Sequence, residues 1–395
     1  MFNIFPLKGG LENVEGFYFQ GVNSNLKPNN EPDLGFIRSD EEVDVEALFT
    51  TNRFQAAPIK HFQKYPQDFK TNFLLVNSKN ANAMTGEKGI EDIEDLFDTL
   101  KEKLPLKNPI MSSTGVIGYR LDKEKIKAAF DKFDFTKRDS DSIARAIMTT
   151  DSFKKEIAFR VETSDKESFH IAAICKGAGM INPAMATMLC FILTDANIPK
   201  SDMKELLSKH VETTFNAISV DGDTSTNDTV MLLTSRKSQN YDKEAFSEAL
   251  RVVMQNLALM IVKDGEGANK VVAFEVKGAK NDKEAKIIAK ALSNSLLVKT
   301  ALFGEDPNWG RIASTIGASG CECDEEKLKI FYDNVLVYSN EKKEMDKETE
   351  ERAFKVMKKD SFKIVCDLGI DEGSFTAYGC DLSYEYVKIN ADYRT

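Results

Sequence analysis

The sequence predicts an α/β or α+β protein with more than one domain. Segments with the alternation of β-strands interleave with segments of helical period along the whole chain. No single run of parallel-type strands demands a Rossmann sheet, and the last third changes to short strands around one highly charged helix. The 395 residues are enough for two or three domains with a well-buried core.

The first part of the chain is expected to alternate strands, turns and helices. Its first 35 residues are rich in Gly, Asn and Pro and predict loops around short strands. The apolar run 72–76 predicts a strand, and the apolar spacing over 90–104 predicts a helix with acids on its other face. Residues 109–120 return to a strand-and-turn pattern.

The remaining elements follow the same two periods. Helices are predicted over 121–133, 140–149, 201–219, 242–262 and 282–301, and strands over 155–161, 168–175 and 271–276. From about residue 320, short strands surround one charged helix at 341–359, which suggests a separate α+β module. The expected division is therefore near residue 280, into domains 1–280 and 281–395.

The composition is that of a globular protein and excludes several function classes. A net charge of −10 argues against a general nucleic-acid binder, and it means that an anionic substrate needs a local cation. The opening MFNIFPLKGG has no basic region followed by a long apolar run, so no signal peptide is expected. The apolar stretch 171–193 contains Lys176, Asn182 and Pro183, so we expect no membrane span. The expected location is the cytoplasm.

Cysteine and histidine usage gives no metal signature. The six cysteines form no CxxC pair and are expected to be free thiols in a reducing compartment. The chain has three histidines and no HExxH motif, so a metal site is not expected. The acids of 221–228 do not fit a calcium loop, because Thr226 and Leu232 stand where such a loop needs Gly and Glu.

The stretch KGAGMINPAMATMLCF at 176–191 places a lysine, glycines and a proline in the most apolar part of the chain. Two interpretations of Thr187 are open at this point. It is either a core threonine whose hydroxyl bonds a backbone carbonyl, or a nucleophile in a glycine-lined pocket. The chain offers Thr187 no Ser-His-Asp type of partner nearby in sequence.

One chemistry needs no histidine. If the bond between Ala186 and Thr187 breaks, Thr187 becomes N-terminal and its own α-amine serves as the base. Such an amine has a pKa near about 7.7–8.0, and a neighbouring cation such as Lys176 lowers it by like-charge repulsion. The hydroxyl can also make the cut by attacking the carbonyl of Ala186.

Two glycine-containing loops carry further candidates. SSTGVIG at 112–118 puts Thr114 and Gly115 at a predicted strand–turn junction, where a glycine can aim a backbone N–H at an oxyanion. In DGEGANK at 264–270, Glu266 lies between glycines and can approach a ligand closely. A plain tight turn and a solvated turn acid are the simpler interpretations of these two loops.

Taken together, the motifs resemble the ornithine acetyltransferase family, also called glutamate N-acetyltransferase. The resemblance covers nearly the full chain and rests on segments in the family's order: AAPI at 56–59, NSKNANAMTGEKG at 77–89, SSTGVIG at 112–118, MTTDS at 148–152, KGAGMINPAMATML at 176–189, SVDGDTSTNDT at 219–229, DGEGANK at 264–270, FGEDPNWGRI at 303–312 and the terminal NADYRT. It implies a helix-flanked sandwich of β-sheets with a smaller C-terminal α+β domain.

The resemblance also implies an activity and a site. Self-cleavage between Ala186 and Thr187 gives an α chain of 1–186 and a β chain of 187–395, which stay together in an α2β2-type assembly. Thr187 is then the nucleophile that carries acetyl from N-acetylornithine to glutamate, and backbone N–H groups near Thr114 and Gly115 stabilise the oxyanion. The positions that match substrate-binding residues are Thr150, Lys176, Thr187, Glu266, Asn390 and Thr395.

The resemblance implies no metal and no bound organic cofactor, and it leaves open whether acetyl-CoA serves as a second acetyl donor. A self-processing aminopeptidase or amidohydrolase with the same N-terminal nucleophile is the alternative. Four positions depart from the family pattern and bear on the preference for the acetyl acceptor. This chain has Lys79 where the family usually has Gly, Met84 where it has Cys, Ala178 where it has Ser and Ala184 where it has Asn.

Overall fold

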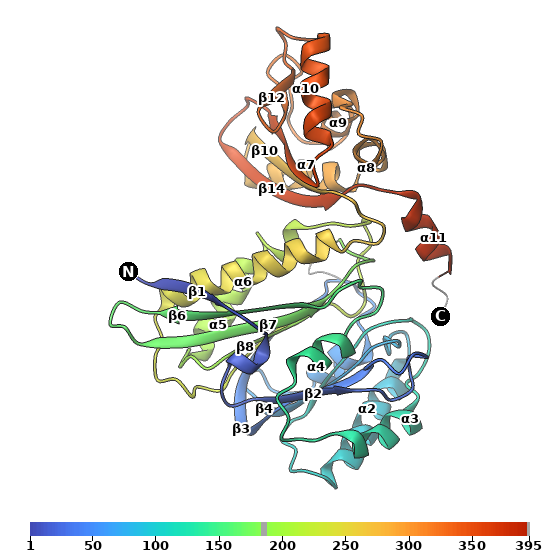
Figure 1. Cartoon of the computed structure of the whole chain (residues 1–395), viewed down its shortest axis with the longest axis vertical. Coiled ribbons are helices and arrows are strands. Elements are labelled where there is room, and N and C mark those ends of the chain that lie inside the picture. Colours follow the sequence, from blue (N-terminus) through green and yellow to red (C-terminus); the bar gives the residue numbers. More distant parts are fainter. Residues whose placement is uncertain (183–187, 393–395) are drawn as a thin grey trace. The chain divides into compact units, whose positions relative to one another are not determined.

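The structure, a computed structural model of the chain, describes residues 1–182 and 188–392. The chain divides into two compact units (Figure 1). The first holds the described residues of 1–177, 184–215 and 224–257, and the second those of 178–183, 216–223 and 258–395. Each unit is built on its own mixed β-sheet with helices against it, so the predicted α/β class with helix-flanked sheets is confirmed.

The first unit is built on a nine-stranded sheet with the order β1-β6-β7-β8-β9-β3-β4-β5, and β2 pairs with β3 beside this path. The pairs β8–β9 and β4–β5 are parallel and the other pairs are antiparallel. The strands are β1 (Asn3–Leu7), β2 (Tyr18–Val22), β3 (Leu34–Phe49), β4 (Lys70–Asn77), β5 (Ile110–Ser113), β6 (Lys155–Glu162), β7 (Ser168–Lys176), β8 (Leu189–Thr194) and β9 (Thr229–Thr234).

Helices cover this sheet because its strands alternate apolar side chains between two faces. On β4, Leu74 and Val76 join a core that includes α4, whereas Phe73 and Leu75 join another that includes α2 and α3. The helices are α1 (Ala57–Phe62), α2 (Gly86–Lys101), α3 (Lys123–Ala129), α4 (Ser140–Ala146), α5 (Lys200–Val211) and α6 (Lys243–Lys263), with 3-10 turns at Leu11–Asn13, Phe130–Lys132 and Phe215–Ala217.

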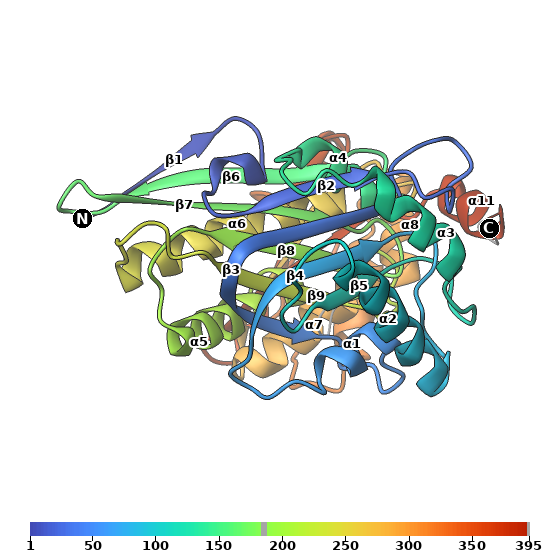
Figure 2. The ribbon, with the colours of Figure 1, turned by 90° about the horizontal axis from the view of Figure 1, so that it is seen from below.

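The long strand β3 was not predicted from the sequence. It bends strongly across the sheet (Figure 2) and pairs with β2, β4 and β9 along its length. Its pairing with β4 shifts register between Arg38 and Val43, and the exposed acids of 40–42 lie at this irregularity. The strand is difficult to predict from the sequence because these acids interrupt its alternation of apolar residues at a bulge.

The second unit contains a five-stranded sheet with the order β12-β11-β13-β10-β14. Its strands are β10 (Val271–Ala279), β11 (Lys329–Tyr332), β12 (Val335–Tyr338), β13 (Ser361–Asp367) and β14 (Gly373–Cys380). Its helices are α7 (Asp282–Asn294), α8 (Leu296–Phe303), α9 (Trp309–Gly317), α10 (Lys347–Met357) and α11 (Tyr384–Asp392). Residues 258–280, which we assigned to the first domain, lie in this unit because β10 pairs with β13 and β14.

Most predicted elements are present, and several predicted helices are shorter in the structure. The helix predicted over 282–301 breaks at Ser295, whose hydroxyl accepts a hydrogen bond from Val298 N at 3.3 Å and so caps α8. The helix predicted over 201–219 ends at Val211. Among the described residues, one helix, α6, is long and apolar enough to cross a membrane, but 56% of its apolar window is buried within the protein, as in a core helix.

Candidate active site

The loop that carries Thr114 and Gly115 follows β5, at the carboxyl end of the parallel pair β4–β5. The carboxyl ends of parallel strands are a common place for ligand sites. Gly115 has a φ of +131°, and a Cβ at this position would lie 2.1 Å from the carbonyl carbon of Lys79. Glycine is therefore required here by both the backbone conformation and the close approach of the neighbouring loop.

The structure corrects one detail of the expected oxyanion site. The Thr114 N–H donates to the carbonyl of Asn77 at 3.0 Å, and Val116 N–H donates to Lys79 O at 3.1 Å. These two N–H groups are therefore occupied. Within the part of the chain that the structure describes, neither the Thr114 hydroxyl nor the Gly115 N–H donates a hydrogen bond. The available donors are Thr114 Oγ1 and Gly115 N–H.

Asn227 joins this loop to the loop after β4. Its amide donates to Ala81 O at 2.6 Å and to Ser113 O at 2.8 Å, and it is buried. The sequence of 221–228 argued against a calcium loop, but it did not indicate this bridging role of Asn227. An asparagine in a polar loop gives no sequence signal for the two distant carbonyls that it contacts.

Lys176 ends β7 and is buried with 4% of its surface exposed. A fully buried ion pair lies close by, in which Lys155 Nζ is 2.7 Å from Asp151 Oδ1. Asp151 also accepts backbone hydrogen bonds from Gly177 at 2.7 Å and Thr149 at 2.9 Å. Burial alone would raise the pKa of Asp151, but Lys176, Lys155 and these hydrogen bonds outweigh it and lower the pKa to about 2.

The start of β8 is fixed beside Lys176. Leu189 pairs with Lys176 in the antiparallel register of β7 and β8, and Met188 N–H donates to Asp228 Oδ1 at 3.1 Å. Thr150 is half-buried and directly precedes Asp151. Thr150, Lys176 and the first residues of β8 thus belong to one unit of the fold.

In the second unit, Glu266 and Asn390 are in direct contact. Asn390 Nδ2 donates to Glu266 Oε2 at 2.7 Å, and Glu266 has 8% of its surface exposed. The carboxylate lies directly over Gly179, where a Cβ would be 2.3 Å from Glu266 Oε1. Gly179 therefore leaves the space that the carboxylate occupies.

Asp221 holds the segment that leads toward the expected cut. Its carboxylate accepts from Met180 N at 2.6 Å and Ile181 N at 2.9 Å, and it faces the Tyr386 hydroxyl at 3.3 Å. Burial raises the pKa of Asp221. Asp151 and Asp221 are both supporting residues that the sequence analysis did not single out, since only the fold shows which backbone groups they bind.

Three predicted site residues, Ala186, Thr187 and Thr395, lie outside the described residues. Of the others, the structure joins Glu266 to Asn390 in the second unit and places Thr114, Gly115, Thr150 and Lys176 in the first. Across residues 1–182 and 188–392, no group of three or more His, Cys, Asp or Glu is arranged to hold a metal ion.

Comparison with known proteins gives a consistent result. The ArgJ family model matches residues 18–395. The chain is 60% identical over 396 residues to the arginine biosynthesis bifunctional protein ArgJ of Wolinella succinogenes, with 100% of each chain covered. It is 42% identical to the glutamate N-acetyltransferase of Methanocaldococcus jannaschii, with 98% of this chain and 99% of that protein covered.

Among solved structures, the ArgJ protein of Bacillus halodurans matches with a TM-score of 0.48 and 41% identity, covering 51% of this chain and 97% of that chain. The match to the ArgJ family model and the curated relatives define the class of the protein, which is an acyltransferase. More particularly, the chain belongs to the ArgJ family.

Proposed function

We propose that this protein is a glutamate N-acetyltransferase that moves the acetyl group of N-acetylornithine to glutamate. The observation that carries the proposal is the pair of donors, Thr114 Oγ1 and Gly115 N–H, on one loop at the carboxyl end of parallel strands. Stabilisation of an acyl-transfer oxyanion requires hydrogen-bond donors of this kind. Relatives named ArgJ or glutamate N-acetyltransferase match over the whole chain, which supports the same reaction.

The reaction proceeds by a ping-pong mechanism through Thr187. The Thr187 hydroxyl attacks the acetyl carbonyl, and its proton passes to the α-amine of Thr187. The carbon–nitrogen bond to ornithine then breaks, and the departing amine takes that proton. Glutamate attacks the acetyl-threonine ester through its own amine, the carbon–oxygen bond breaks, and the hydroxyl re-forms. Water must be kept out, because it would hydrolyse the ester.

Self-cleavage between Ala186 and Thr187 exposes this amine. The fold supports association of the two products, because β8 and β9 follow the cut in sequence yet lie between β7 and β3 in the sheet. Each product therefore supplies strands that the other needs for its backbone hydrogen bonds. We infer an α2β2 assembly of 1–186 and 187–395 chains.

The charges of the proposed substrate-binding residues suit an amino-acid substrate. Lys176 is a buried cation that can bind a carboxylate, and Glu266 is a nearly buried carboxylate that can bind the ornithine ammonium. Asn390 orients Glu266 through their 2.7 Å hydrogen bond. Thr150 and Thr395 complete the proposed substrate-binding set.

The proposed enzyme needs no metal and no bound organic cofactor, because the nucleophile, base and oxyanion donors are protein groups. Since the Wolinella succinogenes relative is named bifunctional, we include acetyl-CoA as a second acetyl donor in the proposal. The substrates are small metabolites, and the proposed location is the cytoplasm.

The test is a product assay with N-acetylornithine, with and without glutamate. We expect ornithine and N-acetylglutamate in equal amounts, parallel double-reciprocal plots, and loss of turnover in Thr187→Ala. Release of free acetate at a rate independent of glutamate would instead identify the amidohydrolase. A separate assay with acetyl-CoA and glutamate decides bifunctionality.

A further inference from the structure

We propose that Asn80 and Arg120 are positioning residues, which hold the Thr114–Gly115 donors in place through a polar network anchored on helix α2. The inference rests on the proposed function, because it assigns these residues a role in aligning the oxyanion donors. Neither residue is assigned a contact with substrate.

Asn80 lies against the donor loop through its backbone and its side chain. Its backbone forms bridges with Thr114 and Val116 on either side of Gly115. Its side-chain amide donates to the carbonyl of Arg120 at 2.9 Å and accepts from Asn82 N–H at 2.7 Å. The same residue thus touches the donor loop just before Gly115, just after it, and again at Arg120.

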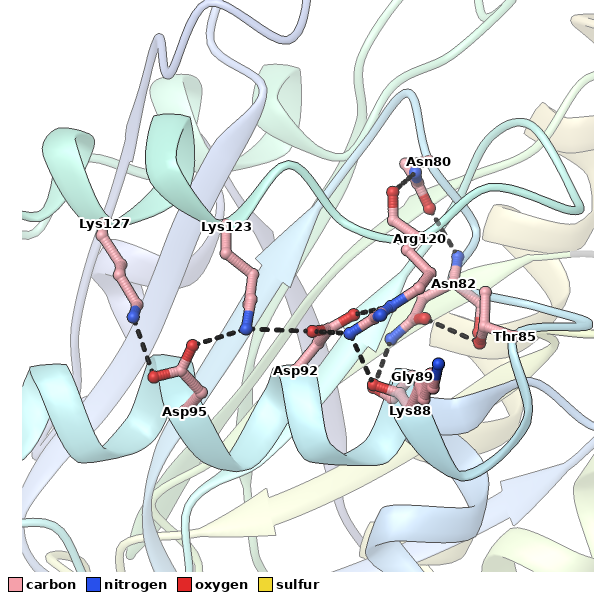
Figure 3. A network of polar contacts seen from close by, with 10 residues as sticks. All are labelled: Asn80, Asn82, Thr85, Lys88, Gly89, Asp92, Asp95, Arg120, Lys123 and Lys127. Atoms are coloured by element: carbon pink, nitrogen blue, oxygen red, sulfur yellow. Dashed lines mark hydrogen bonds and ion pairs between the residues drawn. The ribbon is translucent and has the colours of Figure 1, made fainter.

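Arg120 fixes the far end of the donor loop to α2 (Figure 3). Its Nε and Nη2 atoms bind the two carboxylate oxygens of Asp92 at 2.8 and 2.5 Å, and Asp92 is fully buried on α2. Two parallel bonds from one guanidinium fix both distance and orientation. The carbonyl that receives Asn80 therefore belongs to a residue that is itself held rigidly.

A second connection anchors the neighbouring loop to the start of α2. Asn82 Nδ2 donates to Gly89 O at 3.0 Å, and Thr85 Oγ1 lies 2.9 Å from Asn82 Oδ1 (Figure 3). Both loops that meet at Gly115 are thus tied to the same helix.

The backbone of the Asn80 loop is strained. Lys79, Asn82 and Met84 all have positive φ values, of 76°, 47° and 59°. Non-glycine residues in this region are costly and persist only where surrounding contacts enforce them, which is typical of functional sites. The carbonyl of Lys79, at one of these strained positions, is the group that packs against Gly115. The network therefore maintains a conformation that the loop would not adopt by itself.

The same network provides a control position for substitutions of Asn80 and Arg120. Lys127 binds Asp95 at 2.8 Å, about one turn of α2 away from Asp92, the partner of Arg120 (Figure 3), and among the described residues its side chain makes no hydrogen bond to either loop. Changing Lys127 removes an ion pair from the same network without changing Asn80 or Arg120.

The experiment compares Asn80→Asp and Arg120→Lys with Lys127→Met. Asn80→Asp keeps the acceptor for Asn82 but places a carboxylate oxygen against the Arg120 carbonyl. Arg120→Lys keeps the charge beside Asp92 but loses the two-point geometry. Steady-state acetyl transfer is measured per cleaved chain, with cleavage quantified by intact mass and folding by thermal unfolding.

We expect kcat to fall roughly 10- to 100-fold in Asn80→Asp and less in Arg120→Lys, with KM for N-acetylornithine within about threefold of wild type. Lys127→Met is expected to keep the wild-type kcat. A purely structural role would lower the unfolding temperature and leave kcat per folded chain unchanged, and that result would overturn the inference. A rise in KM with unchanged kcat would overturn it as well.

Failure of the proposed function gives a different result. In that case the wild-type protein itself transfers no acetyl to glutamate, whereas failure of the positioning role leaves wild-type transfer intact. If Asn80→Asp is not cleaved, the kcat and KM of Arg120→Lys test the positioning role by the same criteria.

Discussion

In the proposed mechanism, Thr114 and Gly115 provide the substrate oxygen with two different kinds of hydrogen-bond donor. Gly115 contributes a backbone N–H whose direction is set by a φ of +131°. Thr114 contributes a side-chain hydroxyl, because its own N–H already donates to Asn77 O. Since a hydroxyl can be removed by mutation and a backbone N–H cannot, Thr114 provides the direct test at the scale of single residues.

Replacing Thr114 by Val keeps the shape of the side chain and removes the hydroxyl. We expect kcat for acetyl transfer to fall by roughly 10²–10³-fold, as for loss of one oxyanion donor. Thr114→Ser keeps the hydroxyl and is expected to retain most of the activity. Equal rates for Thr114→Val and wild type would exclude Thr114 Oγ1 as a donor.

Helices α1 and α2 meet at His61, and this contact makes stability sensitive to pH. His61 has 6% of its surface exposed and packs against Tyr65 and Phe97, at ring-centroid distances of 5.5 and 5.7 Å. Burial, which outweighs the opposing charge of Glu94 and is assisted by Lys64, lowers the pKa of His61 to about 4. Folding therefore keeps this imidazole neutral where the unfolded chain would protonate it.

This difference between the pKa of His61 in the folded and unfolded states determines how the free energy of unfolding changes with pH. Above pH 6.5 the imidazole is neutral in both states, so its contribution to stability is fully present. As the pH falls toward 4, only the unfolded state gains the proton, and the free energy of unfolding falls by about 3 kcal/mol. Urea unfolding at pH 7, 5.5 and 4 tests this. His61→Gln should lose less stability than wild type over that range, and equal losses would contradict it.

A glycine also allows a helix to pack closely against the sheet. A Cβ on Gly21 of β2 would lie 2.2 Å from the carbonyl oxygen of Ser142 in α4, a backbone atom that cannot move by itself. We expect Gly21→Ala to lower the free energy of unfolding by about 1–3 kcal/mol, as for overpacking.

Gly317 is a glycine at which substitution by alanine should have the opposite effect on stability. It lies within α9 with nothing within 4 Å of its Cβ position. Gly317→Ala should raise the free energy of unfolding by up to about 1 kcal/mol, because alanine favours a helix. Chemical denaturation of both variants measures the two effects. An opposite sign for either would show that the local packing differs from that described.

Most elements with a regular period were predictable from the sequence, whereas β3, which polar residues interrupt, was not. Strands 155–161 and 168–175 and the helix at 242–262 were read correctly because their side chains alternate or repeat without interruption. β3 was missed because its acids at 40–42 fall on a bulge. The break at Ser295 was missed because an apolar helical period continues through the capping serine.

For the candidate site, sequence motifs indicated which residues matter but not which atoms act. Gly115 of SSTGVIG was singled out because a glycine can aim a backbone N–H at a ligand, and the structure shows that it has a positive φ of 131°. The use of the Thr114 N–H by Asn77, the Lys155–Asp151 pair near Lys176, and the Asp92–Arg120 pair depend on long-range contacts. Such contacts leave no pattern in a single sequence.

At the scale of the whole molecule, the order of strands links self-cleavage to assembly. The proposed cut lies between β7 and β8 in sequence, and β8 pairs with both β7 and β9. β9 in turn pairs with β3, so strands from both sides of the cut alternate within one sheet. Cleavage of one bond therefore leaves the strand pairings intact.

We expect the cleaved protein to behave as one species under native conditions. Size-exclusion chromatography should give a single peak containing both chains, at the mass of an α2β2 assembly. The chains should separate only in denaturant, since separation breaks the β7–β8 and β9–β3 ladders. Native separation into 1–186 and 187–395 fragments would contradict the interleaved sheet.

The central claim is that Thr187 carries the acetyl group on a chain that begins with it. The most direct measurement is intact-mass analysis of wild-type protein and Thr187→Ala, each incubated with N-acetylornithine and then with glutamate. The proposed mechanism predicts two wild-type chains split after residue 186, with one acetyl group gained by the 187–395 chain and lost when glutamate is added. Thr187→Ala should stay a single unacetylated chain. An uncleaved wild-type chain, or a cleaved one that never gains the acetyl group, would contradict the mechanism.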